Sequence, residues 1–262
     1  MEFLLIIIVS FGAAILTFFS GFGLGTILLP VFAVFFPVEM AIAMTAIVHL
    51  ANNFFKLFLV KTFIDKSIVI RFAIPASIFA FIGAYTLKLM TSDIVLLAFT
   101  INNFNFEISL LKLIIGVLMF IFAIIELNKK LQQITFSSSY LPLGGSLSGF
   151  FGGLSGHQGA LRSMFLIKSG LSKEAFIATG IATAVLIDIS RLSIYGFTFF
   201  TKNENLTTIN NAYQLVVLAC VAAFLGSYLG KKFLKKVTID HVNTIVGVMI
   251  LTTSFLLIFG II

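Results

Sequence analysis

The sequence predicts an all-α integral membrane protein. Of its 262 residues, 60% are hydrophobic and only 10% are charged, whereas about 25% of the residues in a soluble domain are charged. Uncharged runs near the length that crosses a bilayer, about 20 residues, recur along the whole chain. They leave no room for a sizeable soluble domain, such as an ATPase or a kinase. The single cysteine, Cys220, excludes a disulfide framework and a thiol metal cluster.

Lys, Asp, Asn and Pro residues bound the hydrophobic stretches, all of which are predicted to be helical. The stretches cover residues 3–36, 38–60, 68–90, 108–127, 141–167, 171–200, 210–230 and 239–262. Clusters of closely spaced glycines interrupt the first and the fifth, in the segments 20–25 (SGFGLG) and 152–159 (GGLSGHQG). These two stretches are therefore predicted to be broken helices.

The two broken stretches stand at corresponding places in a twofold repeat. A shift of 134 residues superposes Gly25 on Gly159, Ala41 on Ala175 and Thr45 on Thr179. Repeats of this kind are common in secondary transporters. The sequence thus predicts a first membrane repeat in residues 1–127, a cytoplasmic linker in 128–140 and a second membrane repeat in 141–262.

The basic residues predict the orientation of the chain. They gather in four places, which are Lys61, Lys66 and Arg71; Lys129 and Lys130; Lys168 and Lys173; and Lys231, Lys232, Lys235 and Lys236. The positive-inside rule makes these four places cytoplasmic, and it puts the connections at 93–107 and 202–204 outside. The net charge of +7 therefore indicates membrane orientation and not a nucleic-acid partner.

This charge pattern requires the fifth stretch to enter from the cytoplasm, turn at its glycines and return. The first stretch does the same from outside, and three full crossings follow in each half. The halves are then inverted repeats, each a re-entrant hairpin plus three helices, and both termini lie outside. If both stretches crossed fully, the basic residues at 231–236 would lie outside instead.

Glycine-rich tips that enter from opposite faces should meet near the midplane, because unpaired backbone is tolerated there only when it is surrounded by protein or water. Free N–H groups near Gly25 and Gly159, together with the positive ends of the helices that follow, favour an anion. This arrangement is expected of a secondary transporter.

Three polar residues lie at the second tip. Arg162 lies within the membrane in the hairpin model, where a cation costs at least about 2.5–3.5 kcal/mol. Its guanidinium either offers paired donors to an oxyanion or extends to the cytoplasmic surface near Lys168. His157 and Gln158 either bind the anion, with His157 able to carry a proton, or hold the turn.

Two further polar groups lie within hydrophobic stretches. Asp188, Arg191 and Tyr195 share one face of the sixth stretch, where the first two form either a structural ion pair or a gating and proton-relay pair. Thr179 and Thr183 extend this face. They either line a pathway or form hydrogen bonds to the preceding backbone carbonyls. The second stretch carries a polar stripe that is expected to face the protein interior, formed by His49, Asn52, Asn53 and Lys56. Lys56 either takes part in this stripe or, more in keeping with its place near the inner end, extends to the cytoplasmic surface. The dispersed histidines give no metal site, and no cofactor is predicted.

The glycine pattern at residues 21–25, Pro30 and the Ala41-x-x-x-Thr45 motif, with their second copy at 149–159 and 175–179, resemble the TauE/SafE family of sulfite exporters, also called the toluene sulfonate uptake permease superfamily. The resemblance covers essentially the whole chain. It implies a transporter of sulfite, sulfonates and related sulfur oxyanions in the prokaryotic inner membrane.

The sequence and the resemblance together predict an alternating-access exporter of small sulfur oxyanions. Its predicted ligands are Gly25, His49, Asn53, His157, Gln158, Gly159 and Arg162, with Asp188 and Arg191 as a gating or structural ion pair. The predicted partners are a small anion and the lipid bilayer, and the chain is either a monomer or a homodimer. The alternatives are an anion channel and a membrane-embedded enzyme that acts on a lipid or thiol through His49, Asp188 and Arg191.

Overall fold

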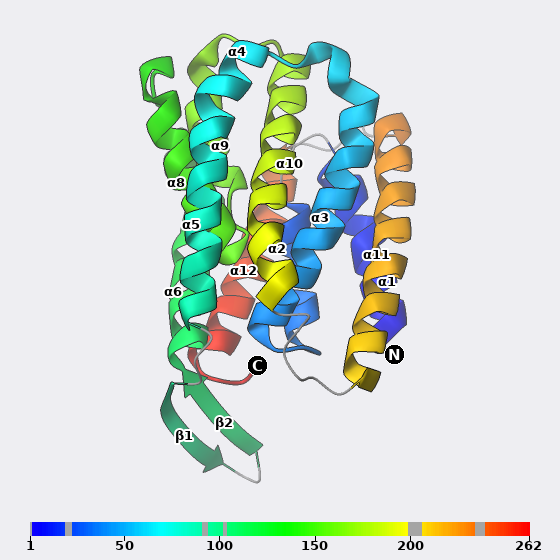
Figure 1. Ribbon diagram of the computed structural model, residues 1–262, viewed down its shortest axis with the longest axis vertical. Coiled ribbons are helices and arrows are strands. Elements are labelled where there is room, and N and C mark those ends of the chain that lie inside the picture. Colours follow the sequence, from blue (N-terminus) through cyan, green and yellow to red (C-terminus); the bar gives the residue numbers. More distant parts are fainter. Residues whose placement is uncertain (1, 19–22, 91–93, 102–103, 199–205, 234–238) are drawn as a thin grey trace.

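Helices make up nearly all of the structure, a computed structural model that describes residues 2–18, 23–90, 94–101, 104–198, 206–233 and 239–262 (Figure 1). The helices are α1 (Glu2–Leu16), α2 (Leu24–Ala33), α3 (Val38–Val60), α4 (Lys66–Ile68), α5 (Ile74–Met90), α6 (Leu110–Leu127), α7 (Lys129–Gln132), α8 (Leu141–Ser155), α9 (Gly159–Leu166), α10 (Lys173–Thr198), α11 (Leu206–Phe233) and α12 (Ile239–Ile258). A π-helical turn, Val69–Ala73, joins α4 to α5. The helices begin and end close to the predicted boundaries.

Five helical segments among the described residues are long and apolar enough to cross a membrane. They are Val38–Phe63, Lys66–Met90, Leu110–Leu127, Lys173–Gly196 and Ala212–Lys232. A row of large apolar side chains points outward from α5, as expected of a face that contacts lipid: Ile74, Ile78, Phe81, Ile82, Tyr85 and Leu89. These features confirm the predicted all-α membrane class.

The helices at the two breaks are too short to span a bilayer one at a time. α1 and α8 have 15 residues each, α2 has 10 and α9 has 8, so at 1.5 Å per residue even the longest covers about 22 Å of a hydrocarbon core of about 30 Å. α1 packs against α2, and α8 packs against α9. The predicted break at 20–25 lies partly outside the described residues.

A glycine in the left-handed conformation stands at each break. Gly23, with φ 104°, precedes α2, and Gly156, with φ 84°, ends α8. The Gly156 N–H donates to the carbonyl of Gly152 at 3.0 Å, as in a helix C-cap. Residues with a Cβ atom adopt this conformation at a cost, which explains why glycines mark both breaks.

The principal helix pairs each join one helix of residues 1–127 to one of residues 141–262. α1 packs on α11, α3 on α10, α5 on α8 and α6 on α12. At two of these contacts the backbones touch: a Cβ at Gly149 would lie 2.0 Å from the Ala76 carbonyl oxygen, and one at Gly226 would lie 2.3 Å from that of Phe11. The repeat boundaries and the inverted relation of the halves stay predictions.

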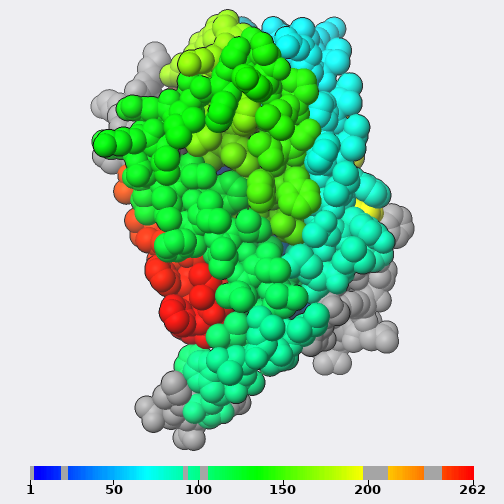
Figure 2. Space-filling view, turned by 90° about the vertical axis from the view of Figure 1, so that its left-hand side faces the viewer, coloured from blue at the N-terminus to red at the C-terminus, as the bar shows by residue number. Residues whose placement is uncertain are grey.

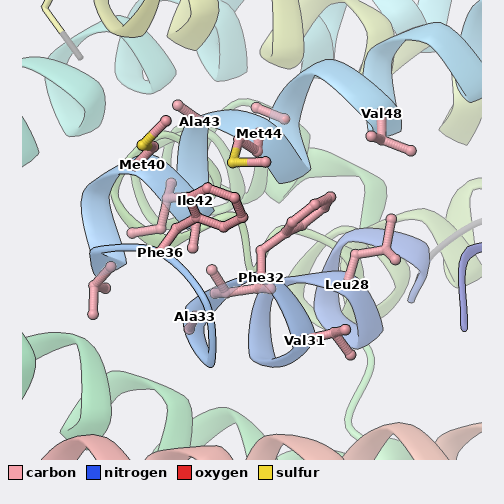
Figure 3. Close-up of a cluster of buried hydrophobic side chains, with 14 of the residues drawn as sticks. Leu28, Val31, Phe32, Ala33, Phe36, Met40, Ile42, Ala43, Met44 and Val48 are labelled. Carbon is pink, nitrogen blue, oxygen red and sulfur yellow. The ribbon is translucent and has the colours of Figure 1, made fainter. Parts of the chain in front are cut away.

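The main hydrophobic core lies around α2 and α3. Side chains from both helices, among them Phe32 and Met44, fill the space between them (Figure 3). Because lipid tails are as apolar as these side chains, helices in a membrane associate mainly through close packing. The core thus fixes α2, and with it the first break, against the central helix α3.

A β-hairpin is the largest element among the described residues that the sequence analysis does not predict. β1 (Val95–Ile101) pairs antiparallel with β2 (Phe104–Ser109), and the rings of Phe99 and Phe106 stack at 5.1 Å. The hairpin projects from the end of the bundle at which α1 begins and α12 ends, opposite α4 (Figures 1 and 2). Sequence analysis treats residues 93–107 only as a polar connection, because the apolar run at 94–101 is too short to cross a membrane.

Gly149→Ala is expected to destabilise the protein by about 1–3 kcal/mol or more, because overpacking forces the α5 and α8 backbones apart. Gly12→Ala is the matched control, since a Cβ at Gly12 would have no neighbour within 4 Å among the described residues. Thermal unfolding in detergent measures both variants. Equal melting temperatures would contradict the close contact between α5 and α8.

Candidate functional site

Buried polar side chains gather where the central helices α3 and α10 pass the two breaks. They come from α3, from α10 and from the α8–α9 tip, and each is at most 6% exposed: His49, Asn53, His157, Gln158, Arg162, Asp188 and Arg191. Polar groups so deeply buried need partners. All of them were predicted from the sequence, and the structure brings them into one region.

An imidazole–carboxylate pair joins α3 to α10. Nδ1 of His49 lies 2.6 Å from Oδ2 of Asp188. Because a carboxylate only accepts hydrogen bonds, Nδ1 carries a proton and donates it. The Asn53 amide nitrogen lies 3.2 Å from both Nδ1 and Nε2 of the same ring, so Asn53 contacts the imidazole of His49 as well.

The second oxygen of Asp188 binds Arg191. Oδ1 accepts hydrogen bonds from Nε of Arg191 at 3.0 Å and from Nη2 at 2.7 Å, a strong charge-assisted arrangement. Arg191 Nη1 also donates to the carbonyl of Gly152 at 3.4 Å, and the Tyr195 hydroxyl donates to the carbonyl of Gly153. One face of α10 therefore holds the last turn of α8.

The His49–Asp188 pair lies between the two breaks. On one side, a Cβ at Gly25 would lie 3.5 Å from Cδ2 of His49. On the other side, Nε2 of Gln158 donates to Oδ1 of Asp188 at 3.5 Å. The first turn of α2 and the tip before α9 are thus connected through two buried side chains.

The N-terminal turns of α2 and α9 also meet at a small cavity. Its volume is about 10 Å³, and Thr26, Phe122, Glu126, His157, Gly159, Ala160 and Ile250 line it. Neither helix is capped by the side chain of its N-cap residue, Gly23 or Gln158. Uncapped N-terminal turns present N–H groups and a positive dipole end to whatever lies beside them.

His157 and Gln158 have both structural contacts and unused capacity. Nδ1 of His157 lies 3.2 Å from the Ser155 hydroxyl, and the Ser148 hydroxyl donates to the backbone carbonyl of Gln158 at 2.9 Å. Within the part of the chain that the structure describes, Nε2 of His157 and Oε1 of Gln158 have no hydrogen-bond partner. Such groups are expected where a ligand or water completes the bonding.

Two more cations are buried beside these tips. Arg162 is 3% exposed and lies inside the protein, with its Nε 3.4 Å from where a Cβ at Gly180 would be. Lys56 is 2% exposed and donates to the Thr17 carbonyl at 3.3 Å. Its ammonium lies 5.6 Å from the centre of the Phe18 ring. Each cation comes from a different half of the chain.

The remaining predicted polar residues serve backbone and helix contacts. Thr179 Oγ1 accepts from the Asp65 N–H at 3.0 Å, and Thr183 Oγ1 donates to the Thr179 carbonyl at 2.9 Å. Oδ1 of Asn52 accepts from the Ser227 hydroxyl at 2.7 Å. These residues thus connect elements around the site.

Glu126 is a buried residue that the sequence analysis missed. It is 6% exposed, although its position three residues before Lys129 is typical of a membrane surface. Within the described residues, the buried charged groups are the acids Asp188 and Glu126 and the bases Lys56, Arg162 and Arg191, besides two histidines. No group of three His, Cys, Asp or Glu side chains among the described residues is arranged to hold a metal ion. The interior therefore has an excess of basic groups.

Comparison with known proteins gives one match. The family model described as "Sulfite exporter TauE/SafE" matches residues 6–257. No curated protein and no solved structure matches the chain. The matched range includes both breaks and every residue of the site described above.

Proposed function

Because the chain belongs to the sulfite exporter TauE/SafE family, we propose that it is a secondary transporter that exports small sulfur oxyanions, such as sulfite or organosulfonates. Family membership over residues 6–257 is the observation that carries the proposal. The membrane is the prokaryotic inner membrane, and both termini lie outside. The family is one of transporters, which disfavours the membrane-enzyme alternative.

The chemistry of the buried site supports an anionic substrate. Lys56, Arg162 and Arg191 outnumber the acids Asp188 and Glu126, and Asp188 is already bonded to Arg191. A tetrahedral or pyramidal oxyanion has several acceptor oxygens, which match a guanidinium and backbone N–H groups. We assign the substrate to Arg162, Gln158, His157 and the N–H groups near Gly25 and Gly159, with His49 and Asn53 facing it.

Alternating access around this site requires that each broken helix line one route to it. In the proposed topology, α1–α2 enters from outside and α8–α9 enters from the cytoplasm, as inverted repeats. The membrane potential, negative inside, favours the efflux of an anion by about 2.3 kcal/mol per charge at 100 mV. Export is therefore favourable without ATP.

Sulfite efflux from proteoliposomes tests this function. We expect flux that saturates with sulfite concentration and accelerates when the interior is made negative, with protein-free liposomes as the control. A current that rises linearly with voltage and does not saturate would instead indicate the anion channel. If sulfite, thiosulfate and taurine all fail to move, the proposed function is wrong.

A further inference from the structure

A carboxyl group and an imidazole line the small cavity between the two breaks. The proposed anion site includes the imidazole but gives no role to the carboxyl group. The cavity volume of about 10 Å³ is near the smallest that holds one water molecule. Glu126 and His157 contribute its titratable groups, and Thr26 contributes a hydroxyl. The other lining residues offer apolar groups or backbone.

Glu126 is placed by α6 and α12. It lies one turn after Phe122 on the same face of α6, and Phe122 lines the same cavity. On the α12 side, a Cβ at Gly247 would lie 3.3 Å from the Cβ of Glu126, so glycine lets α12 lie close to the acid. The carboxyl group is thereby held among helices, in a residue that is 6% exposed, whereas Lys129 and Lys130 are exposed.

His157 also lines this cavity. Its ring stacks on Phe122 with centroids 5.5 Å apart and planes 10° apart, and its Nδ1 is engaged by Ser155. Nε2 is buried, and the described residues provide no hydrogen-bond partner for it. An unpartnered buried nitrogen beside a water-sized space implies a bound water or a transferable proton.

We propose that Glu126 and His157 form a proton-binding site, bridged by one water molecule, whose occupancy is coupled to anion binding at the neighbouring tips. The coupling rests on the proposed transport function. The Glu126 carboxylate takes a proton from water to become a carboxylic acid. It passes that proton through the bridging water to Nε2 of His157, which returns it to water on the other side when the cavity opens there.

The cavity suits a proton better than a metal cation. Hard cations such as Ca²⁺ and Mg²⁺ take about six or more oxygen ligands. The side chains that line this cavity offer oxygen only from Glu126 and Thr26, and its volume of about 10 Å³ leaves room for no more than about one water molecule. A carboxyl and an imidazole are, by contrast, ordinary proton carriers.

Coupling follows from the place of the cavity. Gly159 and Thr26, in the first turns of α9 and α2, line it, so a proton there raises the positive potential where the anion is proposed to bind. The charged groups on the surrounding elements are Arg162 on α9, Arg191 with its partner Asp188 on α10, the exposed Lys129 and Lys130 on α7, and residues near the helix starts, Lys112 on α6 and Lys173 and Glu174 on α10. Asp240 and His241 begin α12, and their side chains lie outside the described residues. By linkage, protonation tightens anion binding, and the anion tightens proton binding by the same factor.

Infrared difference spectroscopy of the purified protein tests the proton site without any anion. As the pH falls, we expect a carboxylic-acid C=O band to appear. The band should be absent from Glu126→Gln, and its midpoint should shift in His157→Gln. Identical bands in the parent and in Glu126→Gln, or an unmoved midpoint in His157→Gln, would overturn the proposal. If Glu126→Gln does not fold, Glu126→Asp replaces it, with a change in band frequency as the expected result.

Repeating this titration with saturating sulfite tests the coupling. We expect the midpoint to rise by about one pH unit, which corresponds to a tenfold change in affinity. An unchanged midpoint, when sulfite still stabilises the protein thermally, would disprove the coupling but leave sulfite transport standing. If sulfite binds at no pH, the transport proposal and the coupling both fail, while the anion-free titration still decides the proton site.

Discussion

Asp188→Asn is expected to destabilise the protein by about 3–5 kcal/mol, the usual cost of breaking a buried ion pair by removing one partner. Asp188 is fully buried and contacts Arg191, His49 and Gln158. Without its charge, the Arg191 guanidinium stays buried with no neutralising carboxylate. We also expect sulfite efflux to fall to the background rate, because the buried Arg191 charge, no longer neutralised, would retain the anion. Thermal unfolding and proteoliposome flux measure the two effects.

A double variant distinguishes the ion pair from a general loss of packing. Adding Arg191→Gln to Asp188→Asn removes both charges, and we expect it to restore most of the lost stability. Glu174→Gln makes the same chemical change at an exposed position and should leave the melting temperature unchanged. If the double variant is as unstable as the sum of the single variants, the pair has no special role.

Arg162→Ala is expected to weaken sulfite binding roughly 10- to 100-fold, because hydrogen bonds to charged groups contribute about 1.5–3 kcal/mol. Arg162 is buried beside the α8–α9 tip, where no other described cation of α9 can replace it. Arg162→Lys keeps the charge but loses the paired donors, so its affinity should lie between those of the parent and the alanine variant. Sulfite-induced thermal stabilisation provides the measurement.

Lys168→Ala is the matched control for Arg162, since it removes an equal charge from an exposed position a few residues further along the chain. It should bind sulfite like the parent. Equal sulfite stabilisation of Arg162→Ala and the parent would show that Arg162 is not a ligand.

The features that the sequence predicts are local ones. Glycine is the residue that readily takes a positive φ, so Gly23 and Gly156 stand at the breaks of the two helices. Helical spacing places Asp188, Arg191 and Tyr195 on one face, and the structure has Arg191 bonded to Asp188. In both cases the physical cause acts within a few residues of the chain.

The features that the sequence analysis misses depend on distant contacts. His49 and Asp188 are 139 residues apart, and no spacing rule pairs them. From the sequence alone, Glu126 is expected to be a surface acid beside Lys129. Its burial results from the packing of α12 against α6. The strands at 95–109 form because two short segments pair with each other, and a search for membrane-length runs does not reveal this.

The glycine contacts of α8 and α1 restrict which parts can move as rigid bodies. α8, from the second half, touches the α5 backbone at Gly149, and α1, from the first half, touches the α11 backbone near Gly226. If residues 1–127 moved as one rigid body relative to residues 141–262, both of these backbone contacts would be broken. No flexible side chain lies between the backbones to adjust to the displacement. The units that can move as rigid bodies are therefore the helix pairs α5 with α8 and α1 with α11. Each pair combines one helix from each half of the chain.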